Sequence, residues 1–205
     1  MFEQLRDEAL AGNDHIIGLD LSEVAIDGSQ HKAPFDGEGT GPNPTDRAKS
    51  GWKWSLATDR VGIPFAWAID GANRNDMTLL APTLTELNSR GLLGEVETLH
   101  LDKGYDNGVA LALTRAAGIT DLVCAKRRKP GAPKVALSPT KNGSHTLGLR
   151  WPVEPTNSWF SNYGQLRRNT DRFIHHRLAQ VDLAVALILT VKLVKWANRW
   201  SPNHT

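Results

Sequence analysis

Apolar and polar positions alternate in blocks that divide the first part of the chain into strands. The apolar, β-branched stretch 15–26 predicts an extended segment that becomes a strand and ends at Asp27. Residues 31–50 are rich in Gly, Pro, Asp and Thr, which predicts a loop. Apolar and aromatic runs at 52–58 and 63–69 are separated by a four-residue turn sequence and predict a β-hairpin.

The middle of the chain alternates helical patterns with short apolar runs. The spacing of apolar residues predicts helices at 77–90 and 108–117, each preceded by an asparagine that can cap its N-terminus. Short apolar runs predict strands at 97–101 and 121–125. This order of elements is typical of an α/β fold whose sheet contains both strand directions.

The C-terminal part of the chain is helical in pattern. Residues 157–166 place four apolar or aromatic side chains on one helical face: Trp159, Phe160, Tyr163 and Leu166. A last helix over 178–196 is apolar almost all round at its centre, which predicts that it is buried. The three tryptophans of the hairpin, at 52, 54 and 67, are expected in the core.

Length and composition restrict the class of protein. The 205 residues suffice for one domain, and 40% hydrophobic with 22% charged residues is a globular composition. The single cysteine, Cys124, excludes an intramolecular disulfide and argues against a Cys-built metal site; in its apolar strand it is expected as a buried, inert thiol. The polar N-terminus lacks a signal peptide, and the longest apolar stretch is too short to cross a bilayer, so a cytoplasmic protein without a membrane partner is expected.

Charge is distributed very unevenly along the chain. Residues 1–121 contain 10 Lys or Arg and 19 Asp or Glu, whereas residues 122–205 contain 14 and 3, giving net charges of −9 and +11. The Pro- and Gly-rich stretch 126–148 is strongly basic and is expected to be a mobile connection within the domain. A basic half attracts a polyanion, so nucleic acid is the favoured partner, the alternative being a solvated basic loop beside an acidic face.

Two aspartates follow apolar strands. Asp27 and Asp102 each come before a glycine-containing turn, where side chains of an α/β sheet project into a shared crevice. Two carboxylates brought together repel unless a hard cation such as Mg²⁺ lies between them. The alternative is that each aspartate only forms a turn, because Asp-Gly is a common turn pair.

Glu154 is a third candidate ligand. It is one of only three acidic residues after Asp121, within a segment that otherwise attracts anions. Pro152 and Pro155 predict that it stands at the start of a helix, because proline is tolerated only in the first turn. The alternative is a local ion pair with Arg150, four residues earlier.

Four longer phrases resemble the catalytic domain of DDE transposases of bacterial insertion sequences. They are VAIDGSQHKAP, GWKWSLATDRVGIPFAWAIDGANRND, TLHLDKGYDN and RWPVEPTNSWFSNYGQLRRNTDRF. The resemblance implies a ribonuclease-H-like fold, an α/β mixed sheet flanked by helices, with catalytic acids at Asp27, Asp102 and Glu154. It also implies a catalytic domain over 15–200 that follows a short N-terminal extension, 1–14.

The resemblance further implies a chemistry and its partners. The three acids would hold Mg²⁺ or Mn²⁺, with two ions expected, for DNA strand cleavage and then transfer of the freed 3′-hydroxyl to target DNA. Double-stranded DNA at the element ends and at the target would be the partner, bound by a homodimer or larger assembly in the nucleoid. The residues expected to contact DNA are Arg150, Lys126, Arg127, Arg128, Lys129, Arg167, Arg168 and Arg172.

Departures from the family pattern leave alternatives open. Arg150 and Glu154 fit one branch's signature, whereas Leu147 and Ser161 stand where that signature has Tyr and Lys. Few residues precede the first catalytic strand, which allows a split transposase with a separately encoded N-terminal half, or a non-catalytic DNA-binding remnant. A ribonuclease-H-like nuclease with other substrates is a third possibility. The pair His175 and His176 is expected at the surface, because neighbours on a helix face different directions.

Overall fold

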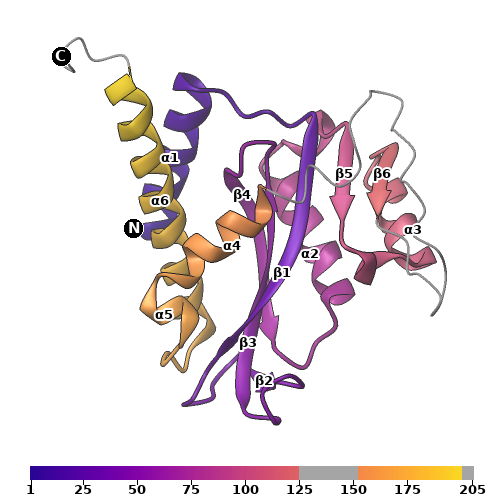
Figure 1. Cartoon of the computed structure of the whole chain (residues 1–205), viewed down its shortest axis with the longest axis vertical. Coiled ribbons are helices and arrows are strands. Elements are labelled where there is room, and N and C mark those ends of the chain that lie inside the picture. Colours follow the sequence, from indigo (N-terminus) through magenta and orange to yellow (C-terminus); the bar gives the residue numbers. More distant parts are fainter. Residues whose placement is uncertain (125–151, 200–205) are drawn as a thin grey trace.

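The computed structural model describes residues 1–124 and 152–199. These residues form six strands, six α-helices and two 3₁₀-helices (Figure 1). In chain order they are α1 (Phe2–Ile16), β1 (Glu23–Lys32), β2 (Gly41–Pro42), β3 (Ser50–Thr58), β4 (Pro64–Gly71), α2 (Asp76–Ser89), η1 (Leu93–Glu95), β5 (Thr98–Leu101), η2 (Lys103–Tyr105), α3 (Gly108–Ala116), β6 (Asp121–Cys124), α4 (Val153–Ser161), α5 (Gly164–Arg167) and α6 (Ile174–Arg199).

One mixed sheet organises the molecule. β1 lies at its centre, antiparallel to β3 on one side and parallel to β5 on the other, and β6 continues the parallel half. The outer edge of β3 pairs with β4 and, at one end, with the two-residue β2. This strand order and the helices around it confirm the expected α/β fold, a mixed sheet flanked by helices.

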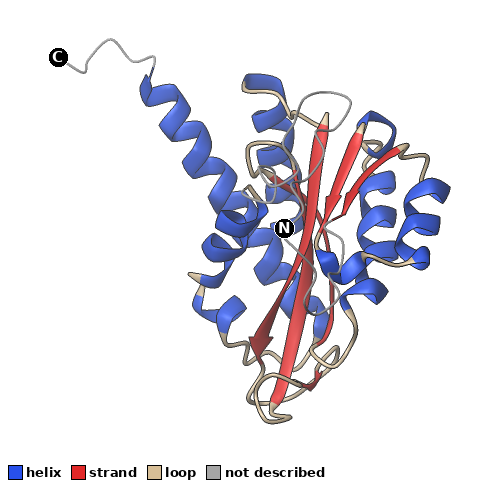
Figure 2. Cartoon of the chain, turned by 45° about the vertical axis from the view of Figure 1, so that its right-hand side comes forward, coloured by secondary structure: helices blue, strands red, loops and turns tan. Residues whose placement is uncertain are grey.

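Helices cover both faces of the sheet. α2 packs on β3 and β4 and contacts α3, so these two helices cover one face. α4 packs on β1 and β3 from the other face, with α5 beside it (Figures 1 and 2). α1 and α6 lie side by side next to α4, which brings the first and last described helices together.

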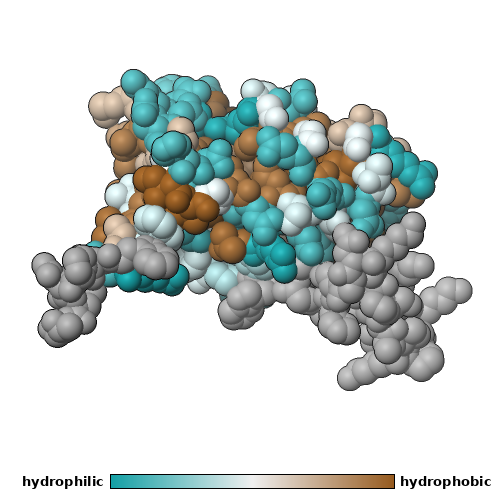
Figure 3. Space-filling model, turned by 90° about the horizontal axis from the view of Figure 1, so that it is seen from above, coloured by the Kyte–Doolittle hydropathy of each residue, from teal (hydrophilic) through white to brown (hydrophobic). Residues whose placement is uncertain are grey.

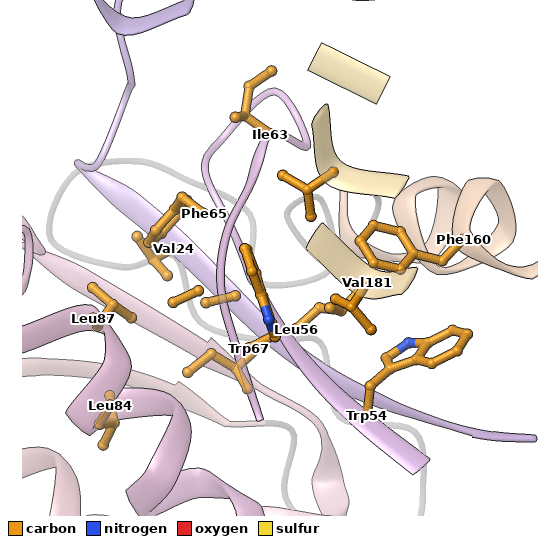
Figure 4. Close-up of a cluster of buried hydrophobic side chains, with 14 of the residues drawn as sticks. Val24, Trp54, Leu56, Ile63, Phe65, Trp67, Leu84, Leu87, Phe160 and Val181 are labelled. Carbon is orange, nitrogen blue, oxygen red and sulfur yellow. The ribbon is translucent and has the colours of Figure 1, made fainter. Parts of the chain in front are cut away.

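The core lies between the sheet and these helices. Trp52 and Trp54 are fully buried and Trp67 is 6% exposed, which confirms the prediction for the hairpin tryptophans. Figure 4 shows Trp54 near Phe160 of α4, while Leu84 and Leu87 project from α2 on the opposite side of the strands. Burial of large aromatic side chains on the α4 face fixes this helix against the sheet.

The predicted hairpin, the two capped helices and the short strands are confirmed, but the first strand differs. β1 begins only at Glu23, because residues up to Ile16 belong to α1. It also continues past Asp27 to Lys32, since β3 pairs with it along this whole length. The prediction that Asp27 ends the strand is therefore wrong. A Cβ atom at Gly28 would lie 3.1 Å from Oδ1 of Asp76, a tight contact that the Asp76 side chain would have to relieve.

The C-terminal helices also differ in detail from the pattern. The predicted helix 157–166 is two helices, because Tyr163 is extended between α4 and α5. This break lets both Phe160 and Leu166 be fully buried, whereas Trp159 is 36% exposed. α6 begins at Ile174, earlier than predicted, and it is buried on one side only, since Leu187 and Val191 are exposed.

Residues 1–14, expected as an N-terminal extension, form most of α1. Arg6 of α1 donates a hydrogen bond to Asp182 of α6 at 2.7 Å, and both side chains are almost buried. Among the described helices, none has the length and apolar character required to span a bilayer. Seen from above, hydrophobic and hydrophilic side chains are interspersed on the surface (Figure 3).

Candidate active site

Asp27 and Asp102 are brought together by the pairing of two parallel strands. Ile26 of β1 pairs with Leu101 of β5, and the next residue on each strand is one of the two aspartates. Asp102 keeps an extended backbone just beyond β5, so the two aspartates directly follow the last paired residues of two neighbouring strands. Residues in register share a face of the sheet, and Asp27 lies on the face covered by α4. Both aspartates are partly exposed.

A relay of hydrogen bonds connects α4 to Asp27. Nε1 of Trp54 on β3 donates to Oδ1 of Asn157 at 2.8 Å, and Nδ2 of Asn157 donates to Oδ2 of Asp27 at 3.3 Å. Glu154 stands three residues before Asn157, in the exposed first turn of α4. Positions three apart lie on one helical face, so Glu154 is one turn from the residue that contacts Asp27. The prediction that Glu154 begins a helix is confirmed.

The backbone at Asp102 is fixed by its neighbours. The carboxylate of Asp102 accepts a hydrogen bond from the backbone N–H of Lys103 and caps η2. Sγ of Cys124 donates to the carbonyl oxygen of Asp102 at 3.2 Å. Burial, with the charges of Asp106 and Asp102, raises the pKa of Cys124 to about 11, so the thiol remains protonated. The prediction that Cys124 is buried is wrong, because the residue is only half-buried, and its raised pKa is consistent with the low reactivity expected for it.

The pattern of hydrophobicity does not single out Tyr105, although it lies beside the aspartates. Its side chain is 3% exposed. Burial raises its pKa above the ordinary value for tyrosine, and the carboxylates of Asp76, Asp27 and Asp102 raise it further. Tyr105 therefore stays neutral, and it packs in the core three residues after Asp102.

A second missed feature lies on the α2 face of the sheet. Lys53 of β3 is 2% exposed, and its Nζ lies 2.7 Å from Oδ1 of Asp76 and 2.7 Å from the carbonyl oxygen of Arg74. This buried ammonium fixes the N-terminus of α2 against the strand that neighbours β1. Side chains alternate between the two faces of a strand, so Lys53 could be predicted to lie on the face of β3 opposite Trp52 and Trp54. The sequence does not show which acidic residue its ammonium group contacts.

The donor groups suit a hard divalent cation. Carboxylate oxygens are the ligands that Mg²⁺ and Mn²⁺ prefer, and Asp27, Asp102 and Glu154 supply three such groups. Within residues 1–124 and 152–199, however, no three His, Cys, Asp or Glu side chains form a group gathered tightly enough to hold a metal ion. The two aspartates follow paired residues of neighbouring strands, and Glu154 is related to them by its place on α4, one turn before Asn157. The pair His175 and His176 is exposed, as predicted.

Three of the predicted DNA-contacting arginines lie at the surface near one end of β1. Arg167, Arg168 and Arg172 are all exposed. The backbone of Arg168 forms an isolated parallel β-bridge with that of Lys32 at the end of β1. Both residues line a surface hollow together with Lys49. The other residues predicted to contact DNA lie outside the described residues: Lys126, Arg127, Arg128, Lys129 and Arg150. The alternative ion pair between Arg150 and Glu154 therefore also lies outside them.

The loop that carries Arg172 is held by a buried guanidinium. Arg177 is fully buried and donates to Oδ1 of Asn169 at 3.2 Å and to the carbonyl oxygen of Asp171 at 3.0 Å. Gly37 packs against this loop so closely that a Cβ atom would lie 2.5 Å from the carbonyl oxygen of Arg172. The exposed arginines are therefore presented by a fixed backbone.

Comparison with known proteins identifies the family of this chain and proteins similar to it. The family model of the transposase DDE domain matches residues 18–189. A Burkholderia cepacia protein described as the transposase of insertion sequence element IS402 is 37% identical over 154 residues, which cover 73% of this chain and 67% of that protein. A solved Mos1 transposase paired-end complex with the left transposon end is 12% identical with a TM-score of 0.33, and the match covers 59% of this chain and 40% of that one. From the first two matches, the chain belongs to the transposase DDE domain family.

Proposed function

We propose that this chain is the catalytic domain of an insertion-sequence transposase that cleaves DNA strands and transfers the freed end, acting on the DNA of the nucleoid in the cytoplasm. Its family membership supports the general activity. Strand cleavage at the element ends and joining of the 3′-hydroxyl to a target are the finer steps of the proposal. Two copies, one at each element end, and a separately encoded N-terminal half belong to the same proposal.

Asp27, Asp102 and Glu154 would hold the divalent metal. When bound, Mg²⁺ or Mn²⁺ supplies charge neutralisation at the phosphodiester and lowers the pKa of a bound water or hydroxyl. The chain's own task is to hold three carboxylates at one place and to keep them oriented. β1 and β5 do this for the two aspartates, and α4 carries the glutamate. No nucleophilic serine or cysteine is required, and the protonated Cys124 fits this chemistry.

The observation that most directly supports the proposal is the strand register beside the docked helix. Asp27 and Asp102 follow a paired Ile26 and Leu101, and the side chain of Asn157, one turn after Glu154, hydrogen-bonds to Asp27. This contact supports a site in which α4, the helix that carries Glu154, lies against the strand that carries Asp27. A set of independent turn-forming aspartates would give no reason for a helix bearing a glutamate to dock there.

Exposed arginines would position the DNA. Arg167, Arg168 and Arg172 lie on a fixed loop and short helix, and guanidinium groups bind phosphate oxygens through paired hydrogen bonds. Contacts to phosphates set orientation without reading sequence. Lys126, Arg127, Arg128, Lys129 and Arg150 are proposed to add to this binding.

We expect Asp27→Asn to abolish metal-dependent nicking of supercoiled DNA while DNA binding remains. Asparagine keeps the size of the side chain and an oxygen that can accept from Asn157, but it removes the charge that binds the metal. Nicking is measured with Mg²⁺ or Mn²⁺, with and without a supplied N-terminal half, and binding is measured by a gel shift. Asp14→Asn, an exposed change on α1, is the control that should remain active.

Other outcomes would favour the alternatives. Equal nicking by the Asp27→Asn protein would refute the metal role of this residue. DNA binding without any metal-dependent nicking by the unaltered chain, in the presence of the N-terminal half, would favour a non-catalytic remnant. Cutting without joining of a 3′-hydroxyl end would favour a ribonuclease-H-like nuclease.

A further inference from the structure

The orientation of the Asn157 amide is determined by Trp54. An indole N–H can only donate a hydrogen bond, and it lies 2.8 Å from Oδ1 of Asn157. Trp54 is fully buried and cannot turn away, because His31 stacks on it at 3.6 Å between ring centroids and Phe160 packs at 5.7 Å. The oxygen of the amide must therefore face Trp54.

The nitrogen of the same amide consequently faces Asp27. Nδ2 of Asn157 lies 3.3 Å from Oδ2 of Asp27, and an NH₂ group donating to a carboxylate is a favourable pair. Neither neighbour would accept the opposite arrangement: an amide oxygen would face a carboxylate, and an amide N–H would face an indole N–H. A side chain with one acceptor and one donor end is thus required between β3 and β1.

α4 has a second anchor that does not involve Asp27. Thr156 is fully buried, and its hydroxyl donates to the carbonyl oxygen of Gly62 in the β3–β4 turn at 2.8 Å. Two adjacent residues of α4 thus attach the helix to different places on the sheet. Of these two residues, Asn157 is the one that contacts an acid of the candidate site.

We propose that Asn157 is a positioning residue that orients the Asp27 carboxylate and couples it to α4, the helix that carries Glu154. This inference rests on the proposed function, in which both acids bind a divalent metal. Partners that orient a metal ligand by hydrogen bonding commonly change metal affinity by about 10- to 100-fold when removed. The role is distinct from helix docking, which Thr156 also performs.

The test compares Asn157→Leu with Thr156→Val. Each change removes buried hydrogen bonds of α4, so each should lower the midpoint of thermal unfolding. Binding of Mn²⁺ to the folded protein is followed by electron paramagnetic resonance of the free ion, and nicking is titrated with Mn²⁺. We expect about tenfold weaker Mn²⁺ binding, and a matching rise in the Mn²⁺ concentration needed for nicking, for Asn157→Leu alone. Equal Mn²⁺ affinity in the Asn157→Leu and unaltered proteins would overturn the proposal.

Trp54→Phe provides a second variant if the leucine protein fails to fold. It keeps an aromatic ring against His31 and Phe160 but removes the N–H that fixes the amide. Weaker Mn²⁺ binding supports the relay, and unchanged binding contradicts it. Asp27→Asn separates the two proposals: if it too binds Mn²⁺ normally, the metal role of Asp27 fails, whereas if only this variant loses binding, Asp27 keeps its role and Asn157 does not.

Discussion

At the scale of single residues, the three candidate acids could be proposed from the sequence, but the residues that contact them could not. Asp27, Asp102 and Glu154 stand inside longer phrases that resemble one family, so their positions are recognisable. Asn157, His31 and Tyr105 act through partners on other elements, and pattern alone does not show which strand faces which helix. The spacing of Asn157, three residues after Glu154, was the one local signal that could have drawn notice to it.

His31 should make the stability of the protein depend on pH. Burial lowers its pKa from 6.5 to about 4, and its Nε2 has no hydrogen-bond partner among the described residues. The imidazole of His31 binds a proton near pH 6.5 in the unfolded chain but only near pH 4 in the folded chain. The free energy of unfolding therefore decreases as the pH falls from 6.5 to 4. The contribution is fully present above pH 6.5, and about 3 kcal/mol is lost as the pH falls to 4, at 1.36 kcal/mol per pKa unit.

The measurement is denaturant unfolding at pH 7.5, 6 and 5. We expect His31→Phe, which keeps a ring against Trp54, to lose less stability on acidification than the unaltered protein. His15→Phe, at an exposed position of α1, should keep the original pH dependence. The same slope in all three proteins would show that His31 does not titrate as described.

At the scale of elements, the β3–β4 turn positions α4. Asp59 is fully buried in this turn and accepts hydrogen bonds from the backbone N–H groups of Val61 and Ile63. Gly62 has a φ of +80°, and a Cβ atom there would lie 2.8 Å from the carbonyl oxygen of Pro152, just before α4. The turn was predictable from the sequence, but its contact with a helix some ninety positions later was not, because no local pattern encodes it.

Gly62→Ala should disturb both stability and nicking, whereas Gly91→Ala should affect stability alone. Both glycines have a left-handed backbone, which costs an alanine about 1 kcal/mol, but nothing lies within 4 Å of a Cβ atom at Gly91. At Gly62 the methyl group must displace the start of α4 and with it Glu154. Thermal unfolding and Mn²⁺-dependent nicking are compared for the two variants. Equal nicking by both would contradict a role for this turn in placing the glutamate.

At the scale of the whole molecule, the order of strands and helices followed from the sequence, and so did the separation of charge. The pairing of α1 with α6 did not, because the pattern of an amphipathic N-terminal helix does not show which other helix it packs against. Arg6 and Asp182 form a buried ion pair between these helices, and such a pair cannot be deduced from either segment alone. Burial raises the pKa of Asp182, and Arg6 partly offsets this effect.

The exposed arginines should dominate the salt dependence of DNA binding within the described part of the chain. Replacing Arg167, Arg168 and Arg172 together by Gln should weaken binding to any sequence and reduce the slope of log K against log[NaCl] by about 3, near 0.9 per phosphate contact. Fluorescence anisotropy with a short duplex, between about 50 and 200 mM NaCl, measures the slope. Arg115→Gln, an exposed change on α3, should leave the slope unaltered.

The union of α1 with α6 has a consequence for synthesis on the ribosome. Arg6 and Asp182 are 176 positions apart, so α1 emerges first and then waits while the whole sheet is translated. Contacts between segments that are distant in sequence form slowly. Until α6 has been synthesised, the nascent chain exposes the surface of α1 that packs against α6 in the folded protein. We therefore expect chains stalled before α6 to bind chaperones, and release to follow only when the last helix arrives.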